Sequence, residues 1–356
     1  MSFHPVVRNP RSRHRAIAVS AMRSASITLG RPRLRVPLSR TASLGILPSR
    51  SFLSYSVNNR VKSDPAGRGG AEMGVYVVTG SASGMGAAVV EKLRSAGNTV
   101  IGVDLRSADV VADLSTATGR RAAIDGVLAA SGGTLDGAVL AAGLGPAPGA
   151  DRPALIVEVN YFGVVDLLEG WHDALASAER AKVVVFSSNS TTTMPAVPGR
   201  AIRAMLAGDS GKAVKATRLF GKNAPAMAYG ASKIAVSRWV RRQAVTARWA
   251  GAGIRLNAIA PGAILTPLLE RQLATPDEAK AIRSFPVPIG GFGVPSQLAE
   301  WVVFMLSDAA DFLCGSVVFV DGGSDAWFRA DDWPRAVPAV RIRGYLARMK
   351  EFAARA

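Results

Sequence analysis

VYVVTGSASGMG, residues 75–86, is the stretch that decides the fold of this chain. Four β-forming residues lead into a turn of small residues, and the apolar periodicity of 87–96 predicts a helix that Gly97 ends. A helix N-terminus after a glycine-rich turn is typical of a site for a dinucleotide pyrophosphate. The spacing is TGxxxGxG and not GxGxxG, so the glycines alone also fit an ordinary turn. Their place between strand and helix favours the nucleotide site, whose expected contacts are Gly80, Ser83, Gly84, Met85 and Gly86.

A second apolar run, 100–103, ends at Asp104, about 20 residues past the glycines. A carboxylate at this place accepts hydrogen bonds from a ribose 2′-hydroxyl and repels a 2′-phosphate. Asp104 therefore favours NAD over NADP. Arg106 is close enough in sequence to reach a phosphate, which weakens the prediction, and a solvated acid at a strand end is the alternative interpretation.

Tyr229 and Lys233 are four residues apart, so on a helix they lie on one face. An ammonium about 5 Å from a phenolate contributes roughly 3 kcal/mol at an effective dielectric of about 20, or about two pKa units. We therefore expect Lys233 to lower the pKa of the Tyr229 hydroxyl into the range of acid/base work near neutral pH. A Tyr-x-x-x-Lys pair is also common on helix surfaces, so its meaning depends on its companions.

Two companions are Ser188 and Asn160. Ser188 follows the strand-like run 182–187, where a parallel sheet presents side chains to its ligand crevice. Asn160 lies in a mostly apolar helical stretch, where an amide needs a hydrogen-bond partner. Singly, a capping serine and a satisfied core asparagine explain them; together with the other motifs they indicate a catalytic site.

These motifs occur in the order found in the short-chain dehydrogenase/reductase family, and the resemblance covers roughly residues 73 to 328. It implies that Tyr229 is the general acid/base, Lys233 its pKa modulator and a ribose ligand, and Ser188 the hydroxyl that positions the carbonyl. It further implies that Asn160 anchors a proton-relay water and Thr266 contacts the nicotinamide carboxamide. The remaining cofactor contacts that it implies are Asp113, Leu114, Ala142, Gly143, Pro261, Gly262 and Ile264.

One departure from the family is Ala141-Ala142-Gly143, which stands where Asn-Ala-Gly is usual, so an asparagine that ties strands together is lost. Segments 113–117, 142–146 and 159–163 resemble bacterial members that act on 3α-hydroxysteroids and xenobiotic carbonyls. This resemblance, with the apolar Met194, Val197, Ile264 and Leu265, predicts NAD-dependent interconversion of an apolar secondary alcohol and ketone. The alternatives are a 3-oxoacyl-thioester reductase, against which Asp104 speaks, and a non-catalytic dinucleotide-sensing module.

The alternation of apolar runs and helical patterns predicts an α/β fold, a single doubly wound parallel-sheet Rossmann domain over 73–328. Further strands are expected at 137–140, 254–259 and 317–320, and helices at 229–249 and 296–306. Residues 189–228 form a long connection before the catalytic tyrosine. Ile202, Met205 and Leu206, then Ala213, Ala216 and Phe220, recur at helical spacing and predict a helical hairpin. We expect this insertion to be a lid, a subunit-contact arm or a surface insertion.

The net charge of +17 is concentrated in residues 1–72, which hold 13 Lys and Arg and two acidic residues. This extension is expected to be disordered, and either a targeting presequence or translated sequence upstream of a start at Met73. The cytoplasm is the expected location, or an organelle if the presequence is genuine. Apart from Arg238, Arg241 and Arg242, which we expect on a solvated or subunit-facing helix surface, the rest of the chain shows little sign of a basic recognition element. We therefore expect no nucleic-acid partner.

The single Cys314 excludes an internal disulfide and a thiolate cluster, and we expect no metal site. His172 is the one histidine of the predicted domain and is expected on a helix surface. In the tail 329–356, an apolar stripe predicts a basic amphipathic helix that packs on its own domain or on a neighbouring subunit, with no stable membrane insertion. The expected assembly is a homodimer or a homotetramer.

Overall fold

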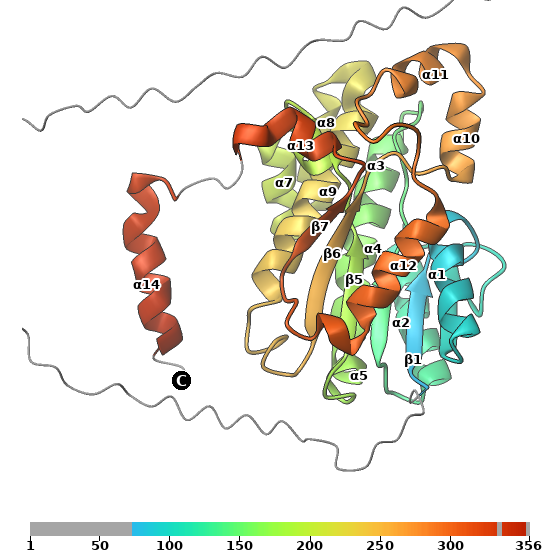
Figure 1. The fold of residues 1–356 in the computed structure, drawn as a ribbon, viewed down its shortest axis with the longest axis vertical. Helices are drawn as coiled ribbons and strands as arrows, with labels where there is room; N and C mark the ends of the chain where they lie inside the picture. Colours follow the sequence, from blue (N-terminus) through green and yellow to red (C-terminus); the bar gives the residue numbers. More distant parts are fainter. Residues whose placement is uncertain (1–72, 333–336, 354–356) are drawn as a thin grey trace, which may run out of the picture. The chain divides into compact units, whose positions relative to one another are not determined.

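The computed structural model describes residues 73–332 and 337–353, so the predictions for 1–72 lie outside the described residues. Seven strands form one parallel sheet in the order β3-β2-β1-β4-β5-β6-β7 (Figure 1). The strands are β1 (Val75–Thr79), β2 (Thr99–Asp104), β3 (Val110–Val111), β4 (Gly137–Leu140), β5 (Lys182–Phe186), β6 (Arg255–Pro261) and β7 (Val317–Val320). β4 and β5 are buried along their whole length, as expected of apolar parallel strands with helices on both faces. The predicted doubly wound fold is confirmed.

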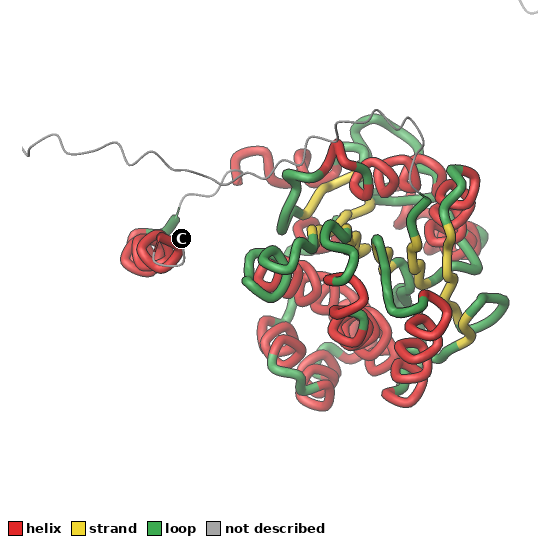
Figure 2. The backbone as a smooth tube through the Cα atoms, turned by 90° about the horizontal axis from the view of Figure 1, so that it is seen from below, coloured by secondary structure: helices red, strands yellow, loops and turns green. Residues whose placement is uncertain are grey.

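Helices cover the sheet on both faces, as the view in Figure 2 shows. On one face, α1 (Gly84–Ser95) and α12 (Pro295–Leu306) pack side by side and bury Val89, Leu93 and Val302 against the sheet. The second face is covered by α2 (Ala117–Ser131), α4 (Gly163–Gly170) and α9 (Ala224–Gln243). The two cores share the central strands, because successive side chains of a strand point to opposite faces.

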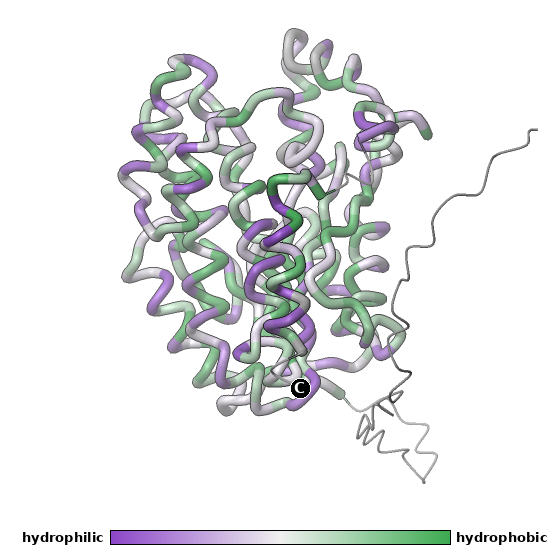
Figure 3. Tube along the Cα trace, turned by 90° about the vertical axis from the view of Figure 1, so that its left-hand side faces the viewer, coloured by the Kyte–Doolittle hydropathy of each residue, from purple (hydrophilic) through white to green (hydrophobic). Residues whose placement is uncertain are grey.

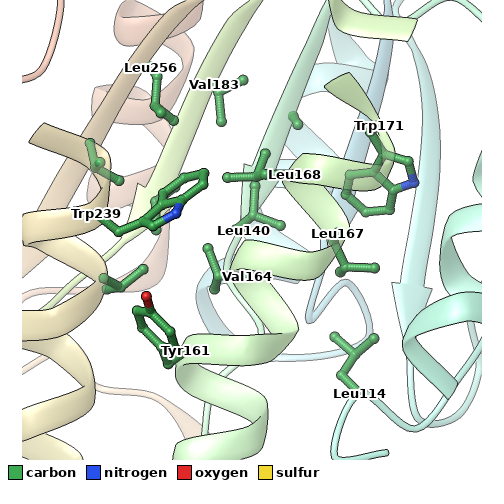
Figure 4. Close-up of a cluster of buried hydrophobic side chains, with 14 of the residues drawn as sticks. Leu114, Leu140, Tyr161, Val164, Leu167, Leu168, Trp171, Val183, Trp239 and Leu256 are labelled. Carbon is green, nitrogen blue, oxygen red and sulfur yellow. The ribbon is translucent and has the colours of Figure 1, made fainter. Parts of the chain in front are cut away.

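The larger core lies under α2, α4 and α9. Figure 4 shows Leu140, Val183 and Leu256 of the sheet facing the aliphatic and aromatic side chains of the helices. Trp171 is fully buried there, and so is Trp249, whose ring lies edge-on to Trp239 with 5.6 Å between the centroids. Burial of such large apolar side chains stabilises the fold by about 2–3 kcal/mol each. This core holds α9, the helix of Tyr229 and Lys233, against the sheet.

Residues 189–228 contain two helices of at least two turns, α7 (Gly199–Leu206) and α8 (Ser210–Arg218). These helices pack on each other and on α9. A short helix, α6 (Ser190–Thr193), precedes them, and a 3₁₀ turn, η2 (Gly221–Asn223), leads into α9. Ile202, Met205 and Ala213 are buried, whereas Phe220 is exposed. The side chain of Asp209 accepts a hydrogen bond from Lys212 N and so caps α8.

The remaining helices are α3 (Arg152–Val157), α5 (His172–Ala176), α10 (Pro267–Leu273), α11 (Pro276–Arg283), α13 (Ser324–Arg329) and α14 (Ile342–Ala353). Hydrophobic and hydrophilic residues alternate along α14 in Figure 3, and Ile342, Tyr345 and Leu346 each expose about half of their surface. Among the described residues, no helix combines the length and the apolar character needed to cross a membrane.

Three features differ from the expectations or were not foreseen. His172 is buried and not on the surface: its Nε2 bonds the carbonyl of Arg248 and its ring lies edge-on to Trp249. The helix of Tyr229 begins five residues earlier than expected, at Ala224, where Pro225 occupies the first turn, and it ends at Gln243. Asn160 lies in a π-helix, η1 (Glu158–Phe162), between α3 and α4.

Candidate active site

The predicted site residues follow the carboxyl ends of the strands. β1 pairs with β2 on one side and with β4 on the other, so the chain reverses its direction of winding between β1 and β4. In doubly wound sheets, ligands bind in the crevice beyond the carboxyl ends of the strands at such a point. Ser188 follows β5 by two residues, and Asp104 and Pro261 end β2 and β6.

Two glycines of the turn after β1, Gly80 and Gly86, have no room for a side chain. Gly80 has φ +69°, and a Cβ atom at Gly86 would lie 2.1 Å from the carbonyl oxygen of Gly80. α1 begins at Gly84, its first turn holds no acid, and the side chain of its N-cap, Ser83, makes no capping hydrogen bond. A Cβ atom at Gly84 would lie 3.5 Å from Cγ2 of Thr266, so Thr266 borders the turn. A close-fitting turn before an uncapped helix N-terminus suits a dinucleotide pyrophosphate.

Asp104 connects β2 to this turn. Its Oδ2 accepts a hydrogen bond from Ala82 N at 3.0 Å, and its Oδ1 accepts one from Leu105 N at 2.7 Å. The carboxylate therefore lies beside the glycine turn, where an adenosine ribose is expected. The structure thus brings Asp104 to the glycine turn.

Asp113 and Leu114 border the same end of the sheet. Oδ1 of Asp113 accepts a hydrogen bond from Ser115 N, and the hydrogen bonds with Ser115 lower the pKa of the Asp113 carboxyl. Leu114 is buried, and its carbonyl accepts a hydrogen bond from the buried guanidinium of Arg120. The same guanidinium pairs with Asp166 and Glu158, a network that no sequence motif signalled.

Tyr229 and Ser188 meet in space although α6, α7 and α8 lie between them in the chain. A hydrogen bond between their side chains lowers the pKa of Tyr229, but burial of the phenol raises it and is the larger effect. The expectation that Lys233 lowers the pKa of Tyr229 is therefore wrong for the protein without bound cofactor. Removing the phenolate from water opposes its formation more than its neighbours favour it.

Lys233 is buried, and its Nζ lies 6.0 Å from the ring centroid of Tyr229 and donates a hydrogen bond to the carbonyl of Phe186 at 2.7 Å. Burial lowers the pKa of Lys233 to about 8. The ammonium is thus fixed by the end of β5 one helical turn from the phenol. Its remaining hydrogens are available for another acceptor in the crevice.

Asn160 connects the π-helix to the loop after β4. Its Oδ1 accepts a hydrogen bond from Leu144 N at 2.7 Å, and its Nδ2 donates to the carbonyl of Leu144 at 3.0 Å. A Cβ atom at Gly143 would lie 3.4 Å from Oδ1 of Asn160 and 3.6 Å from Nζ of Lys233, so these three residues converge. π-bulges occur often at functional sites, and this one carries Asn160.

Several predicted cofactor residues have packing contacts of their own. Ala142 N donates to Oγ1 of Thr79 at 3.1 Å, which joins β4 to β1. A Cβ atom at Gly262 would lie 2.7 Å from Cα of Asp321, so this glycine allows β6 and β7 to end side by side. Ile264 is buried and forms a bridge with Gly293.

Apolar side chains lie next to the tyrosine. A Cβ atom at Gly230 would lie 2.6 Å from Sδ of Met194 and 3.2 Å from Cγ2 of Val197, so the loop after α6 packs directly over the residue that follows Tyr229. Met194 and Val197 are two of the apolar residues predicted to contact the substrate, and both lie against α9.

Comparison with known proteins agrees with this geometry. A family model described as enoyl-(acyl carrier protein) reductase matches residues 80–325. The chain is 39% identical over 259 residues to 3-alpha-hydroxysteroid dehydrogenase/carbonyl reductase of Comamonas testosteroni, covering 72% of this chain and 98% of that protein. It is 33% identical to cis-4-hydroxycyclohexanecarboxylate dehydrogenase of Sinomonas cyclohexanicum, over 71% of this chain and 96% of that protein.

Among solved structures, the 3-alpha-hydroxysteroid dehydrogenase from Pseudomonas sp. B-0831, complexed with NADH, has a TM-score of 0.68 and 44% sequence identity. The similarity covers 73% of this chain and 100% of that structure. Levodione reductase superposes with a TM-score of 0.56 at 26% identity, over 71% of this chain and 97% of that structure. Fold, motif order and these similarities agree, and the chain belongs to the short-chain dehydrogenase/reductase family.

Proposed function

We propose that this oxidoreductase interconverts a secondary alcohol and a ketone on an apolar, cyclic substrate, with 3α-hydroxysteroids and xenobiotic carbonyls as the first classes to test. The observation that carries the proposal is the convergence of Ser188, Tyr229, Lys233 and Asn160 beside the glycine turn. The enzyme uses NAD, consistent with the NADH complex of the Pseudomonas relative and with the carboxylate of Asp104 beside the turn.

In the oxidation direction, the phenolate of Tyr229 removes the proton of the substrate hydroxyl while Oγ of Ser188 holds the substrate oxygen. Bound NAD supplies the acceptor for the hydride that leaves the carbinol carbon. In reduction, the phenol of Tyr229 returns the proton to the carbonyl oxygen, a direction that its raised pKa favours. Ser190 N donates to Oγ of Ser188 at 3.1 Å, which fixes this hydroxyl beside the phenol of Tyr229.

Lys233 and Asn160 orient this machinery in the proposal. The ammonium of Lys233 stabilises the phenolate and binds the nicotinamide ribose, while the bond to Phe186 fixes its position. Asn160 holds Leu144 with both ends of its amide and so fixes the loop that borders the lysine. The water of a proton relay would bind beside this amide.

The remaining expected residues hold the cofactor in the proposal. Asp104 accepts hydrogen bonds from the adenosine ribose, and Thr266 binds the carboxamide. The turn and the strand ends enclose the rest of the cofactor through Gly80, Ser83, Gly84, Met85, Gly86, Asp113, Leu114, Ala142, Gly143, Pro261, Gly262 and Ile264.

The substrate class draws on the relatives. The Comamonas protein is named for 3α-hydroxysteroids and carbonyls, and the Sinomonas protein for a hydroxycyclohexane. A hydroxyl on a saturated ring is common to the steroid and the cyclohexane. Met194, Val197 and Ile264 supply apolar surface for such a ring.

The test is NAD-dependent oxidation of a panel of 3α-hydroxysteroids, cyclohexanols and 3-hydroxyacyl thioesters, followed by the absorbance of reduced nicotinamide. The proposal expects turnover of the ring alcohols and a preference for NAD. Turnover restricted to thioesters with NADPH would identify an acyl-thioester reductase instead. Cofactor binding with no turnover of any substrate would identify a dinucleotide-sensing module.

We further propose that residues 73–328 form the catalytic domain and that the protein works in the cytoplasm as a homodimer or homotetramer. Sedimentation equilibrium of the purified chain tests the assembly, because a monomer at micromolar concentration would contradict it. Fractionation of the native host tests the location.

A further inference from the structure

The buried guanidinium of Arg120 joins three segments that lie far apart in the chain. Arg120 belongs to the first two turns of α2, and its Nη1 donates to the carbonyl of Leu114 at 3.1 Å and to Oε2 of Glu158 at 3.0 Å. Its Nε donates to Oδ2 of Asp166 at 2.7 Å. Only 8% of the Arg120 side chain is exposed, so solvent and salt screen these ion pairs weakly. One planar group thus holds together the loop after β3, the π-helix η1 and α4.

Two of these segments carry residues assigned to the cofactor or to the reaction. Leu114 belongs to the loop that is proposed to contact the cofactor. Glu158 begins η1, the π-helix that contains Asn160, and Asn160 in turn fixes the loop after β4 through both ends of its amide. The two segments are also in contact, because a Cβ atom at Gly163, the residue after η1, would lie 3.4 Å from Cβ of Leu114. Arg120 therefore connects two parts of the proposed site.

Glu158 extends this network to the insertion before Tyr229. Its second oxygen, Oε1, accepts a hydrogen bond from Oγ of Ser210 at 2.5 Å, and Ser210 is the first residue of α8. A hydrogen bond to a carboxylate is stronger than one between neutral groups. The cap of α8 is the side chain of Asp209, so the helix begins without help from the Ser210 hydroxyl. The bond between Ser210 and Glu158 therefore attaches the insertion to the π-helix.

We propose that Arg120 and Glu158 are positioning residues for the reaction. Arg120 holds the Leu114 loop against the adenosine half of the cofactor, and Glu158 holds Asn160 in the position that orients the nicotinamide half. Ser210 transmits the position of the insertion to Asn160 through Glu158. The inference rests on the proposed function and adds to it a route by which the insertion affects the rate.

The bonds that each substitution removes predict different effects on binding and on rate. Arg120→Lys keeps the charge but loses the planar fork that bonds three groups at once. We expect the Kd for ADP-ribose, a probe of the adenosine half, to rise about fivefold, and kcat for a ring alcohol to fall about tenfold. Ser210→Ala removes the bond to Glu158 and keeps the Leu114 loop in place. It should lower kcat about threefold and leave the Kd for ADP-ribose unchanged.

A double substitution separates positioning from a general loss of stability. If Ser210 acts through Asn160, the substitution Ser210→Ala should change kcat no further in an Asn160→Ala background. Two unrelated losses would instead act independently, and their effects on kcat would multiply. Multiplied effects would therefore overturn the route from Ser210 to Asn160.

Lys182→Met is the matched control for Arg120→Met. Lys182 is also buried and also pairs with two carboxylates, those of Asp308 and Asp311, but it begins β5 at the end of the sheet opposite the proposed site. Both substitutions remove a buried cation from two carboxylates and should lower the melting temperature. Only Arg120→Met should weaken the binding of ADP-ribose, and Arg120→Lys replaces it in the comparison if it does not fold. An equal change of Kd in the two positions would assign the effect to lost stability and overturn the inference.

Binding of ADP-ribose, measured by isothermal titration, separates this inference from the proposed function. The measurement needs no substrate, so weaker binding by Arg120→Lys than by the wild type supports the positioning role even where no ring alcohol is turned over. Turnover of ring alcohols with the same Kd and kcat in the wild type, Arg120→Lys and Ser210→Ala would retain the proposed function and overturn the inference.

Discussion

The Nζ of Lys233 lies 6.0 Å from the centroid of the Tyr229 ring, one helical turn along α9, and is bound to the carbonyl of Phe186 at the end of β5. This bond attaches the helix of the proposed acid/base to an interior strand of the sheet, between β4 and β6. Both groups are shifted toward their neutral forms by burial, the phenol upward in pKa and the ammonium downward to about 8. The pair thus lies in a low-dielectric crevice, where the charge of a bound ligand has a large effect on the pKa of both groups.

The lowered pKa of Lys233 predicts a specific pH dependence of stability. In the unfolded chain this lysine holds its proton up to about pH 10.5, and in the folded protein it releases it near pH 8. Between these values the unfolded state binds more protons, so the free energy of unfolding rises with pH. We expect the difference between wild type and Lys233→Met to increase by about 3 kcal/mol from pH 8 to pH 10.5. Urea unfolding across this range measures it, and a difference independent of pH would contradict the burial of a neutral lysine.

Removal of the Asn160 amide should reduce both stability and activity. Asn160→Ala leaves the N–H and C=O of Leu144 without their partners. This should lower the free energy of unfolding by about 1–3 kcal/mol. Asn98 is a matched control, because its amide also bonds two backbone groups, Gly74 N and the carbonyl of Leu93, outside the proposed site. Asn98→Ala should lower stability alone, whereas Asn160→Ala should also lower kcat. Equal kcat in the two variants, measured at a temperature where both are folded, would remove Asn160 from the site.

Two glycines of the crevice should respond differently to alanine. At Gly143 a Cβ atom meets Asn160 and Lys233 only at ordinary contact distance, so Gly143→Ala should fold normally. The added methyl group enters the space proposed for the nicotinamide half, and we expect the Kd for NAD to rise about tenfold. At Gly86 the same atom would lie 2.1 Å from a carbonyl oxygen, so Gly86→Ala should lower the free energy of unfolding by roughly 3 kcal/mol. A Gly143→Ala protein with unchanged Kd would place the cofactor elsewhere.

Asp104 should set the choice between NAD and NADP. Asp104→Asn keeps an oxygen for Ala82 N but removes the charge that repels a 2′-phosphate, so the ratio of kcat/KM for NAD to that for NADP should fall about tenfold. Asp109→Asn is the control, because the Asp109 carboxylate lies in the same region but bonds Gly102 N and Arg94. A change of cofactor ratio in the control and not in Asp104→Asn would refute the assignment.

The sheet was predictable because its strands are short, continuous apolar runs separated by helical patterns, as at 137–140 and 182–186. The proximity of Tyr229 and Lys233 was also predictable, because residues four apart lie on one face of a helix. The two-residue strand β3 was not predictable. Val110–Val111 is too short to show a pattern of its own, and it is a strand because it pairs with β2.

Other features depend on contacts that the local sequence does not encode. The π-helix at Asn160 inserts one residue into the helical ladder, and the amide of Asn160 bonds Leu144, 16 residues away in the chain. His172 is buried because its Nε2 bonds the carbonyl of Arg248, 76 residues away in the chain, and its ring packs on Trp249. The pKa of Tyr229 moves opposite to the simple Coulomb expectation, because the loss of water around the phenol is a property of the packed site.

The central claim is that the phenol of Tyr229 exchanges the proton of the substrate, and the Tyr229→Phe protein tests it most directly. The measurement is the rate of NADH formation from a ring alcohol that the wild type oxidises, with NAD binding measured on the same sample. We expect NAD to bind with nearly unchanged affinity and kcat to fall by about a thousandfold, in the range of general acid/base catalysis. A Tyr229→Phe protein that binds NAD and oxidises the alcohol at the wild-type rate would contradict the account.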